Sequence, residues 1–199
     1  ITLNLNAGQR CNRLELRDTI KTLHRAWSRL VQRSLLKRYS KGYHRTTEVT
    51  VKYEDQGEPS FNPHIHATLL FDAADSTETE ALVLVRGEIK RSWSKLIRSE
   101  ARKLKLKPAI TFSAQHVDKL ATQTQDDLEG WLHYSVKGVI EPIAQQFSSA
   151  GREPSPEQVA ETWSTLHTEL PHQRLSSLGG LFRSALHEVR TERDQERAD

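Results

Sequence analysis

Two histidines two positions apart, His64 and His66 in the segment FNPHIHATLLF, are the residues of this chain best suited to chemistry. Successive side chains of a β-strand point to opposite faces, so residues two apart share one face. Both imidazoles therefore project from the same side of a strand expected at residues 61–72. A bare His-X-His pair is more often solvent-facing surface than a pair of metal ligands, so the neighbouring strand has to decide between the two.

The preceding segment, residues 43–53, alternates in the same way, and the Gly- and Pro-containing connection between the two segments predicts a β-hairpin. A hairpin centred in that connection places Glu48 opposite His66 and Thr50 opposite His64. The same register gathers the apolar residues of both strands on the other face. Two imidazoles and a carboxylate within about 5 Å can share a metal ion and leave coordination positions for water or substrate. Such a ligand set is typical of a catalytic metal site.

A second reactive pair lies in the segment WLHYSVK, where Tyr134 and Lys137 are three residues apart. A helix is expected at residues 125–137, and this spacing puts both side chains on one helical face. A lysine ammonium beside a phenol favours the phenolate, which lowers the pKa of the tyrosine and later stabilises phosphate charge. The motif alone is common on helices. Combined with a metal ion that polarises a phosphodiester, it describes a device that cuts nucleic acid.

The formal net charge of +3 hides an uneven distribution of the 29 basic and 26 acidic residues. Basic residues dominate residues 1–53 and 86–107, and acidic residues dominate 54–80 and 118–199. Localised positive charge is expected of a protein that binds phosphates. The side chains expected to contact DNA phosphates are Arg91, Lys95, Arg98 and Arg102.

Periodicity predicts the elements that position these groups. Alternation of apolar and polar residues predicts strands at residues 1–6, 43–53, 61–72 and 109–117. Apolar residues recurring every three or four positions predict helices at 12–39, 82–107, 125–137, 156–170 and 180–196. The order indicates an α+β fold with a central antiparallel β-sheet flanked by helices. A Ser/Gly/Pro-rich stretch at 148–156 suggests two parts, a catalytic domain at residues 1–147 and a helical C-terminal extension at 148–199.

Composition excludes several other classes of protein. The single cysteine rules out a disulfide scaffold and a Cys-rich zinc site, and it fits a reducing, cytoplasmic location. No apolar run approaches the roughly 20 residues of a membrane-spanning helix. With 36% hydrophobic residues the chain is lean but globular.

The motifs, in their order and approximate spacing, resemble those of the HUH endonucleases, in which U stands for a hydrophobic residue. Within that superfamily the chain looks most similar to the rolling-circle replication initiators of bacterial plasmids. The resemblance runs from the first residue to about residue 140, with a fainter echo in RLSSLGGLF at 174–182. It rests on ITLNLN, LRDTIKTLHRAWSRL, GYHRTTEVTV, FNPHIHATLLF, SWSKL and HYSVK.

The resemblance implies a ferredoxin/RRM-like sheet and a specific chemistry. His64 and His66 would bind Mg²⁺ or Mn²⁺, with Glu48 as the acidic ligand. Tyr134 would attack a single-stranded nick site in origin DNA, leaving a 5′-phosphotyrosine link and a free 3′-OH that primes replication, with Lys137 near the phosphate. Mixed imidazole–carboxylate ligation suits Mn²⁺ better than Mg²⁺. The implied partners are single- and double-stranded plasmid origin DNA and the host helicase and polymerase.

One position departs from the family pattern. Some relatives carry a glutamate one helical turn before the tyrosine, which activates water and ends the cycle. Here that position is Gly130, and Glu129 lies one residue away, rotated by about 100° around the helix. Two alternatives stay open: Glu129 acts as the general base from a frayed helix, or a homodimer supplies a second Tyr134.

Competing interpretations differ in what they require. A transposase of the same superfamily usually pairs its tyrosine with a glutamine four residues on, where this chain has Gly138. Conjugative relaxases usually place the tyrosine before the histidine motif. A non-catalytic DNA-binding module would keep the basic helices and form no covalent adduct. A His/His/carboxylate iron oxygenase has no use for Tyr134, Lys137 or two basic helices.

Overall fold

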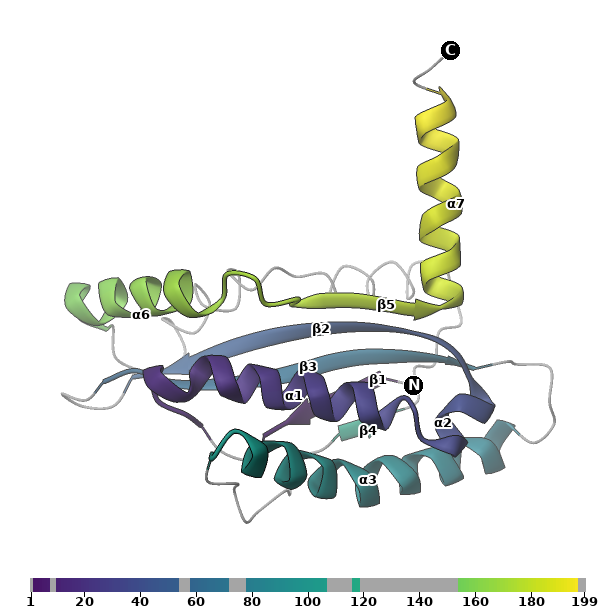
Figure 1. Ribbon diagram of the computed structural model, residues 1–199, viewed down its shortest axis with the longest axis horizontal. Helices are drawn as coiled ribbons and strands as arrows, with labels where there is room; N and C mark the ends of the chain where they lie inside the picture. The colour runs from purple at the N-terminus through teal and green to yellow at the C-terminus, as the bar shows by residue number, and fades with distance from the viewer. Residues whose placement is uncertain are drawn as a thin grey trace.

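The computed structural model describes residues 2–7, 10–53, 58–71, 78–106, 116–118 and 154–196. At its centre lies a five-stranded sheet in the order β4-β1-β3-β2-β5 (Figure 1). Its strands are β1 (Thr2–Asn6), β2 (Ser40–Lys52), β3 (Ser60–Phe71), β4 (His116–Asp118) and β5 (Ser176–Gly180). Every neighbouring pair of strands is antiparallel. The predicted α+β fold, an antiparallel sheet flanked by helices, is confirmed.

The N-terminal helical region is divided, although its periodicity predicts one helix over residues 12–39. It consists of η1 (Arg13–Glu15), α1 (Leu16–Leu30) and α2 (Ser34–Tyr39). The side chain of Asn12 caps the start by accepting from the Glu15 N–H at 3.0 Å. Arg33 adopts an extended ψ of 142°, which separates α2 from α1 and lets Leu36 reach the core.

Helix α3 (Glu78–Lys103) lies within a few residues of the predicted 82–107. It ends before Lys105, whose positive φ of 57° is incompatible with a continuing helix. The predicted helix at 125–137 and most of the predicted strand at 109–117 lie outside the described residues. None of the helices in the described part of the chain combines the length and apolar character needed to cross a bilayer.

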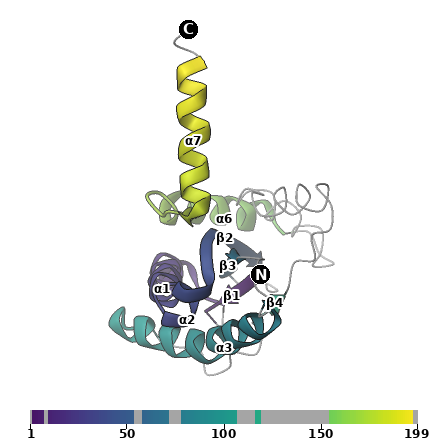
Figure 2. The same cartoon turned by 90° about the vertical axis from the view of Figure 1, so that its right-hand side faces the viewer.

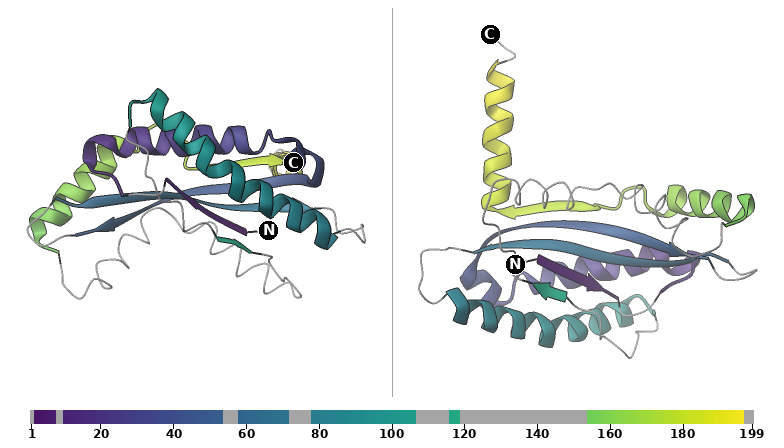
Figure 3. Two further views of the ribbon diagram at one scale, coloured as in Figure 1. Left: turned by 90° about the horizontal axis from the view of Figure 1, so that it is seen from below. Right: turned by 180° about the vertical axis from the view of Figure 1, so that it is seen from behind.

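Helices α1 and α3 cover the same face of the sheet, as Figures 2 and 3 show. Odd-numbered residues of β1 and β3, such as Leu5 and Ile65, point to this face and are fully buried there. Trp93 of α3 lies in the same cluster and donates from Nε1 to the carbonyl oxygen of Asn6 at 2.9 Å. Because strand residues alternate, even-numbered residues of β1, β2 and β3 point to the opposite face.

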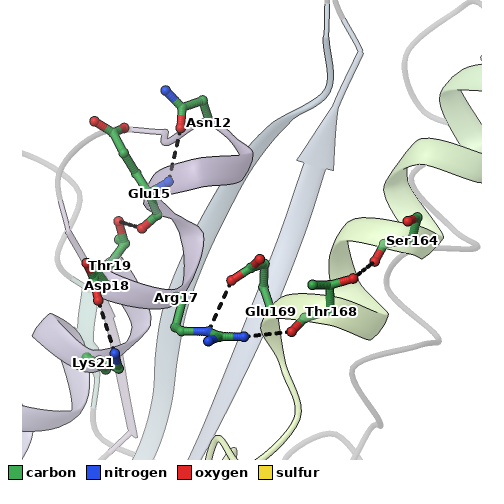
Figure 4. Close-up of polar contacts among 9 residues, drawn as sticks. All are labelled: Asn12, Glu15, Arg17, Asp18, Thr19, Lys21, Ser164, Thr168 and Glu169. Carbon is green, nitrogen blue, oxygen red and sulfur yellow. Dashed lines mark hydrogen bonds and ion pairs between the residues drawn. The ribbon is translucent and has the colours of Figure 1, made fainter.

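The C-terminal segment joins the main sheet rather than forming only helices. Helix α6 (Pro156–Glu169) begins with a capping box between Ser155 and Gln158 and lies close to the predicted 156–170. Arg17 of α1 ties its end by ion-pairing with Glu169 at 3.1 Å and donating to the Thr168 carbonyl (Figure 4). The following strand β5, which the sequence does not predict, pairs with β2 at the edge of the sheet.

Helix α7 (Leu181–Glu196) stands away from the sheet (Figure 1) and falls within the predicted 180–196. Gly180, the residue just before α7, has a φ of +57°, which favours glycine. A side chain on Gly179 would meet the ring of Tyr43, so both glycines are needed where β5 pairs with β2. The predicted boundary between residues 147 and 148 lies outside the described residues and stays a prediction.

Candidate metal centre

The hairpin of β2 and β3 brings Glu48, His64 and His66 together on the face of the sheet opposite α1 and α3. The predicted grouping is therefore present, but the predicted register is wrong. Glu48 lies opposite His64 rather than His66, because Lys52 pairs with Ser60 and the turn is centred one residue earlier. A shift of two residues in the pairing keeps every side chain on its face, so the same groups still meet.

Both imidazoles approach a single carboxylate oxygen. Glu48 Oε2 lies 2.8 Å from His66 Nε2 and 3.4 Å from His64 Nε2. The candidate ligand atoms of all three residues lie within 4.8 Å of one another. Neighbouring ligands in an octahedral shell with bonds of about 2.1 Å are about 3 Å apart. The spacing is therefore close to what one divalent ion requires.

The backbone orients the His64 ring. His64 Nδ1 lies 3.0 Å from the carbonyl oxygen of Asn62, so Nδ1–H donates there and Nε2 is the ring nitrogen that faces Glu48. A histidine whose second nitrogen is held in this way is a typical metal ligand. His64 is buried and His66 half-buried, so their rings have little freedom to turn away.

Glu48 is charged over the whole physiological range. Burial raises its pKa, but hydrogen bonds and charges from His64 and His66 outweigh burial and lower the pKa to about 2. An ionised carboxylate between two imidazoles is the donor set that Mn²⁺ accepts readily, whereas Mg²⁺ prefers oxygen ligands alone. The residues present therefore fit a divalent metal ion.

Two asparagines of β1, which are not among the predicted site residues, border this cluster. Asn6 lies opposite His64 and Asn4 lies opposite His66, so both belong to the same face. The alternation in ITLNLN predicts this position, because Leu3 and Leu5 lie on the apolar face of the strand and the asparagines lie on the other face. On the other side of β1, His116 of β4 pairs with Asn4.

The predicted nucleophile and its helpers are not described. Tyr134, Lys137 and Glu129 all lie outside the described residues. Their roles remain predictions from the motif.

The predicted DNA-binding residues lie on α3, away from the metal cluster. Their helix, α3, packs its buried side chains on the opposite face of the sheet. The four recur at steps of four, three and four residues, and none of them is buried: Arg91, Lys95, Arg98 and Arg102. The sheet therefore separates these positive charges from Glu48 and the two histidines.

Comparison with known proteins places this chain in one family. No curated protein and no solved structure matches it. The sequence model of the Rep_1 family, described as "Replication protein", matches residues 1–199. The chain therefore belongs to the Rep_1 family of replication proteins.

Proposed function

We propose that this replication protein is a plasmid rolling-circle initiator that nicks and rejoins single-stranded origin DNA. The observation that carries the proposal is the convergence of His64 Nε2, His66 Nε2 and Glu48 Oε2 on the face of the sheet opposite α1 and α3, in a Rep_1 protein. A phosphodiester resists attack because its oxygens are negatively charged. A cation held beside the bound DNA strand would offset this negative charge and make the phosphorus easier to attack.

In the proposed reaction the Tyr134 oxygen forms a bond to the scissile phosphorus, and the bond from phosphorus to the 3′ oxygen breaks. The tyrosine gives up its hydroxyl proton and keeps the 5′ phosphate, while the leaving 3′ oxygen takes up a proton from solvent and becomes the 3′-OH primer. A bound Mn²⁺ or Mg²⁺ supplies Lewis-acid polarisation of the scissile phosphate. Lys137 compensates charge near that phosphate, three residues from the tyrosine on the helix predicted at residues 125–137.

Termination requires a second transfer. Glu129 is the proposed general base if it reaches a water molecule. The alternative is a second Tyr134 from another copy of the chain, which predicts a dimer during the reaction. A rate of strand rejoining that does not change with protein concentration, in a protein that stays monomeric, would favour Glu129.

The test is formation of a covalent adduct. The protein is incubated with Mn²⁺ and labelled single-stranded oligonucleotides that tile both strands of the replicon that encodes it, and then denatured. An adduct that survives denaturation and disappears in Tyr134→Phe and with chelator is the expected result. No adduct on any oligonucleotide would sink the proposal and favour a non-catalytic DNA-binding module.

Metal binding has its own readout, independent of cleavage. Mn²⁺ titrated into the protein and followed by electron paramagnetic resonance is expected to bind the wild type at least about 10–100-fold more tightly than His64→Gln. His187→Gln, on exposed helix α7, is the matched control and should bind like the wild type. Equal affinities for all three proteins would contradict the assignment of the ligands.

A further inference from the structure

We infer that the outer surface of α3 binds double-stranded DNA at a place separate from the metal cluster, so one molecule holds two DNA segments on opposite faces of its sheet. The inference rests on the proposed function only for the presence of DNA at the cluster. Its own basis is a stripe of charge, defined as Arg91, Lys95, Arg98 and Arg102.

The stripe points directly away from the protein core. Steps of four, three and four residues keep side chains on one side of a helix. The buried residues of α3, among them Ile89, Trp93 and Leu96, occupy the other side and pack against the sheet. From Arg91 to Arg102 the helix rises about 16 Å, close to the rise of five base pairs.

Glu88 and Glu100, the acidic residues of α3 whose side chains are described, leave Arg91, Lys95 and Arg102 exposed. The Glu100 side chain is 3% exposed and forms ion pairs with Arg29 at 2.6 Å and Lys103 at 2.8 Å. Glu88 contacts Arg91 at 3.5 Å and leaves the guanidinium 67% exposed. Glu100 thus holds α1 against α3 through Arg29, while Arg91, Lys95 and Arg102 stay exposed on the outer side of the helix.

The distance to the metal cluster excludes a single short strand as the shared ligand. Glu48, His64 and His66 lie on the face that α3 does not cover. The stripe is separated from them by the sheet and by at least the width of α3, about 10 Å. A strand held at the cluster therefore cannot also lie along the stripe without passing around the molecule.

The chemistry of the stripe favours a duplex over a single strand. Single-strand binders combine positive charge with aromatic rings on which bases stack. Trp93 of α3 is fully buried. Among the described residues, the only exposed large aromatic side chain is Trp163, which lies on α6. A surface of charge without stacking platforms matches the phosphate backbone of a double helix.

The test measures duplex binding against salt. A labelled duplex of about 20 base pairs, two helical turns, is titrated with the full chain between about 50 and 200 mM salt. Lys95→Gln/Arg102→Gln should reduce the slope of log affinity against log salt by about 2, since each phosphate contact contributes about 1. Arg13→Gln/Arg190→Gln, with the same charge change on exposed residues outside α3, should leave the slope within about 0.5 of the wild type.

Adduct formation on the single-stranded oligonucleotide separates the possible failures. Lys95→Gln/Arg102→Gln is expected to form the adduct at the wild-type rate within about twofold, because the stripe does not touch that strand. An unchanged salt slope in this variant overturns the inference and points to another occupant, such as an acidic protein. Loss of the adduct together with duplex binding overturns it as well. Absence of the adduct in the wild type, with the duplex result intact, refutes only the proposed function.

Discussion

Acidification should weaken the fold through a histidine that the proposed chemistry does not use. His24 of α1 lies over β2 with Nε2 at 2.9 Å from Thr47 Oγ1. Arg45, only 4% exposed, donates to the same oxygen at 3.1 Å. Thr47 Oγ1 accepts from Arg45 and still has its own hydroxyl hydrogen, which the neutral ring of His24 can accept at Nε2. Protonation of the ring removes this acceptor and places a second cation beside Arg45.

The size of the effect follows from the pKa of the ring. Burial, assisted by the charge of Arg45, lowers the pKa of His24 from 6.5 to about 3. Between these values the unfolded chain binds a proton that the folded chain does not. The stability contribution is thus complete above pH 6.5 and is lost as pH falls, by at most about 1.4 kcal/mol per unit. From pH 6.5 to about pH 5 the expected loss is about 1–1.7 kcal/mol, the lower value allowing for partial solvent screening of the ring.

The assay is urea denaturation followed by tryptophan fluorescence, at a series of pH values, for the wild type and His24→Gln. The glutamine keeps a hydrogen-bonding group near Thr47 and cannot titrate, so its free energy of unfolding should fall less steeply with acidification. The difference between the two proteins isolates His24 from His44, whose pKa burial also lowers. Parallel curves within about 0.3 kcal/mol over this range would refute the reasoning.

Two further substitutions test the packing that supports the sheet. Glu100→Gln removes the buried carboxylate shared by cations of α1 and α3 and should lower the free energy of unfolding by about 1–3 kcal/mol. The control is Glu88→Gln, at a more exposed carboxylate, which should lower the free energy of unfolding by less than about 1 kcal/mol. Equal losses for the two variants in urea denaturation would contradict the assigned burial. Gly180→Ala places a Cβ against the carbonyl oxygen of Lys41 at a positive φ and should destabilise by at least about 2 kcal/mol. Gly87→Ala, with only a side chain nearby, should be neutral or stabilising by up to about 1 kcal/mol, and a neutral Gly180→Ala would be inconsistent with the close approach.

Alternation along β2 and β3 was enough to predict which side chains meet, but not which residues pair. The cluster of Glu48, His64 and His66 depends only on the parity of their positions, and parity is unchanged by a shift of two. The pairing itself depends on where the turn is centred, and a connection containing Gly57 and Pro59 is compatible with several turn geometries.

Strand β5 was missed because its stability comes from tertiary contacts rather than from its own residues. SSLGG has no β-branched residue and no alternation. It is held by Arg45, which donates to Ser177 Oγ at 3.0 Å and to the Arg174 carbonyl at 2.8 Å. The two glycines allow the backbone to come close to β2. Such contacts are invisible until the partner strand is known.

The face of the sheet that the basic helices cover does not follow from the periodicity of those helices alone. The periodicity of α3 shows that it has an apolar side and a charged side. It does not show which face of the sheet receives the apolar side. Alternation along β1 gives one constraint, since Leu3 and Leu5 point to one face of the strand and Asn4 and Asn6 to the other. The apolar sides of the helices must cover the leucines. Applied together, these two patterns place the charged helix away from the histidines.

The hairpin register is therefore the feature on which both faces depend. Arg45 and Thr47 of β2 serve the buried network under α1, and Glu48, the very next residue, serves the metal cluster. A slip of one residue would bury the carboxylate under α1 and expose the guanidinium, which costs far more than any single hydrogen bond. Arg10 stabilises the correct pairing near the turn, since it donates to the carbonyl of Thr50 at 3.1 Å and to that of Ser60 at 2.6 Å, one from each strand. The chemistry proposed for this sheet thus rests on the same pairing that keeps its core apolar.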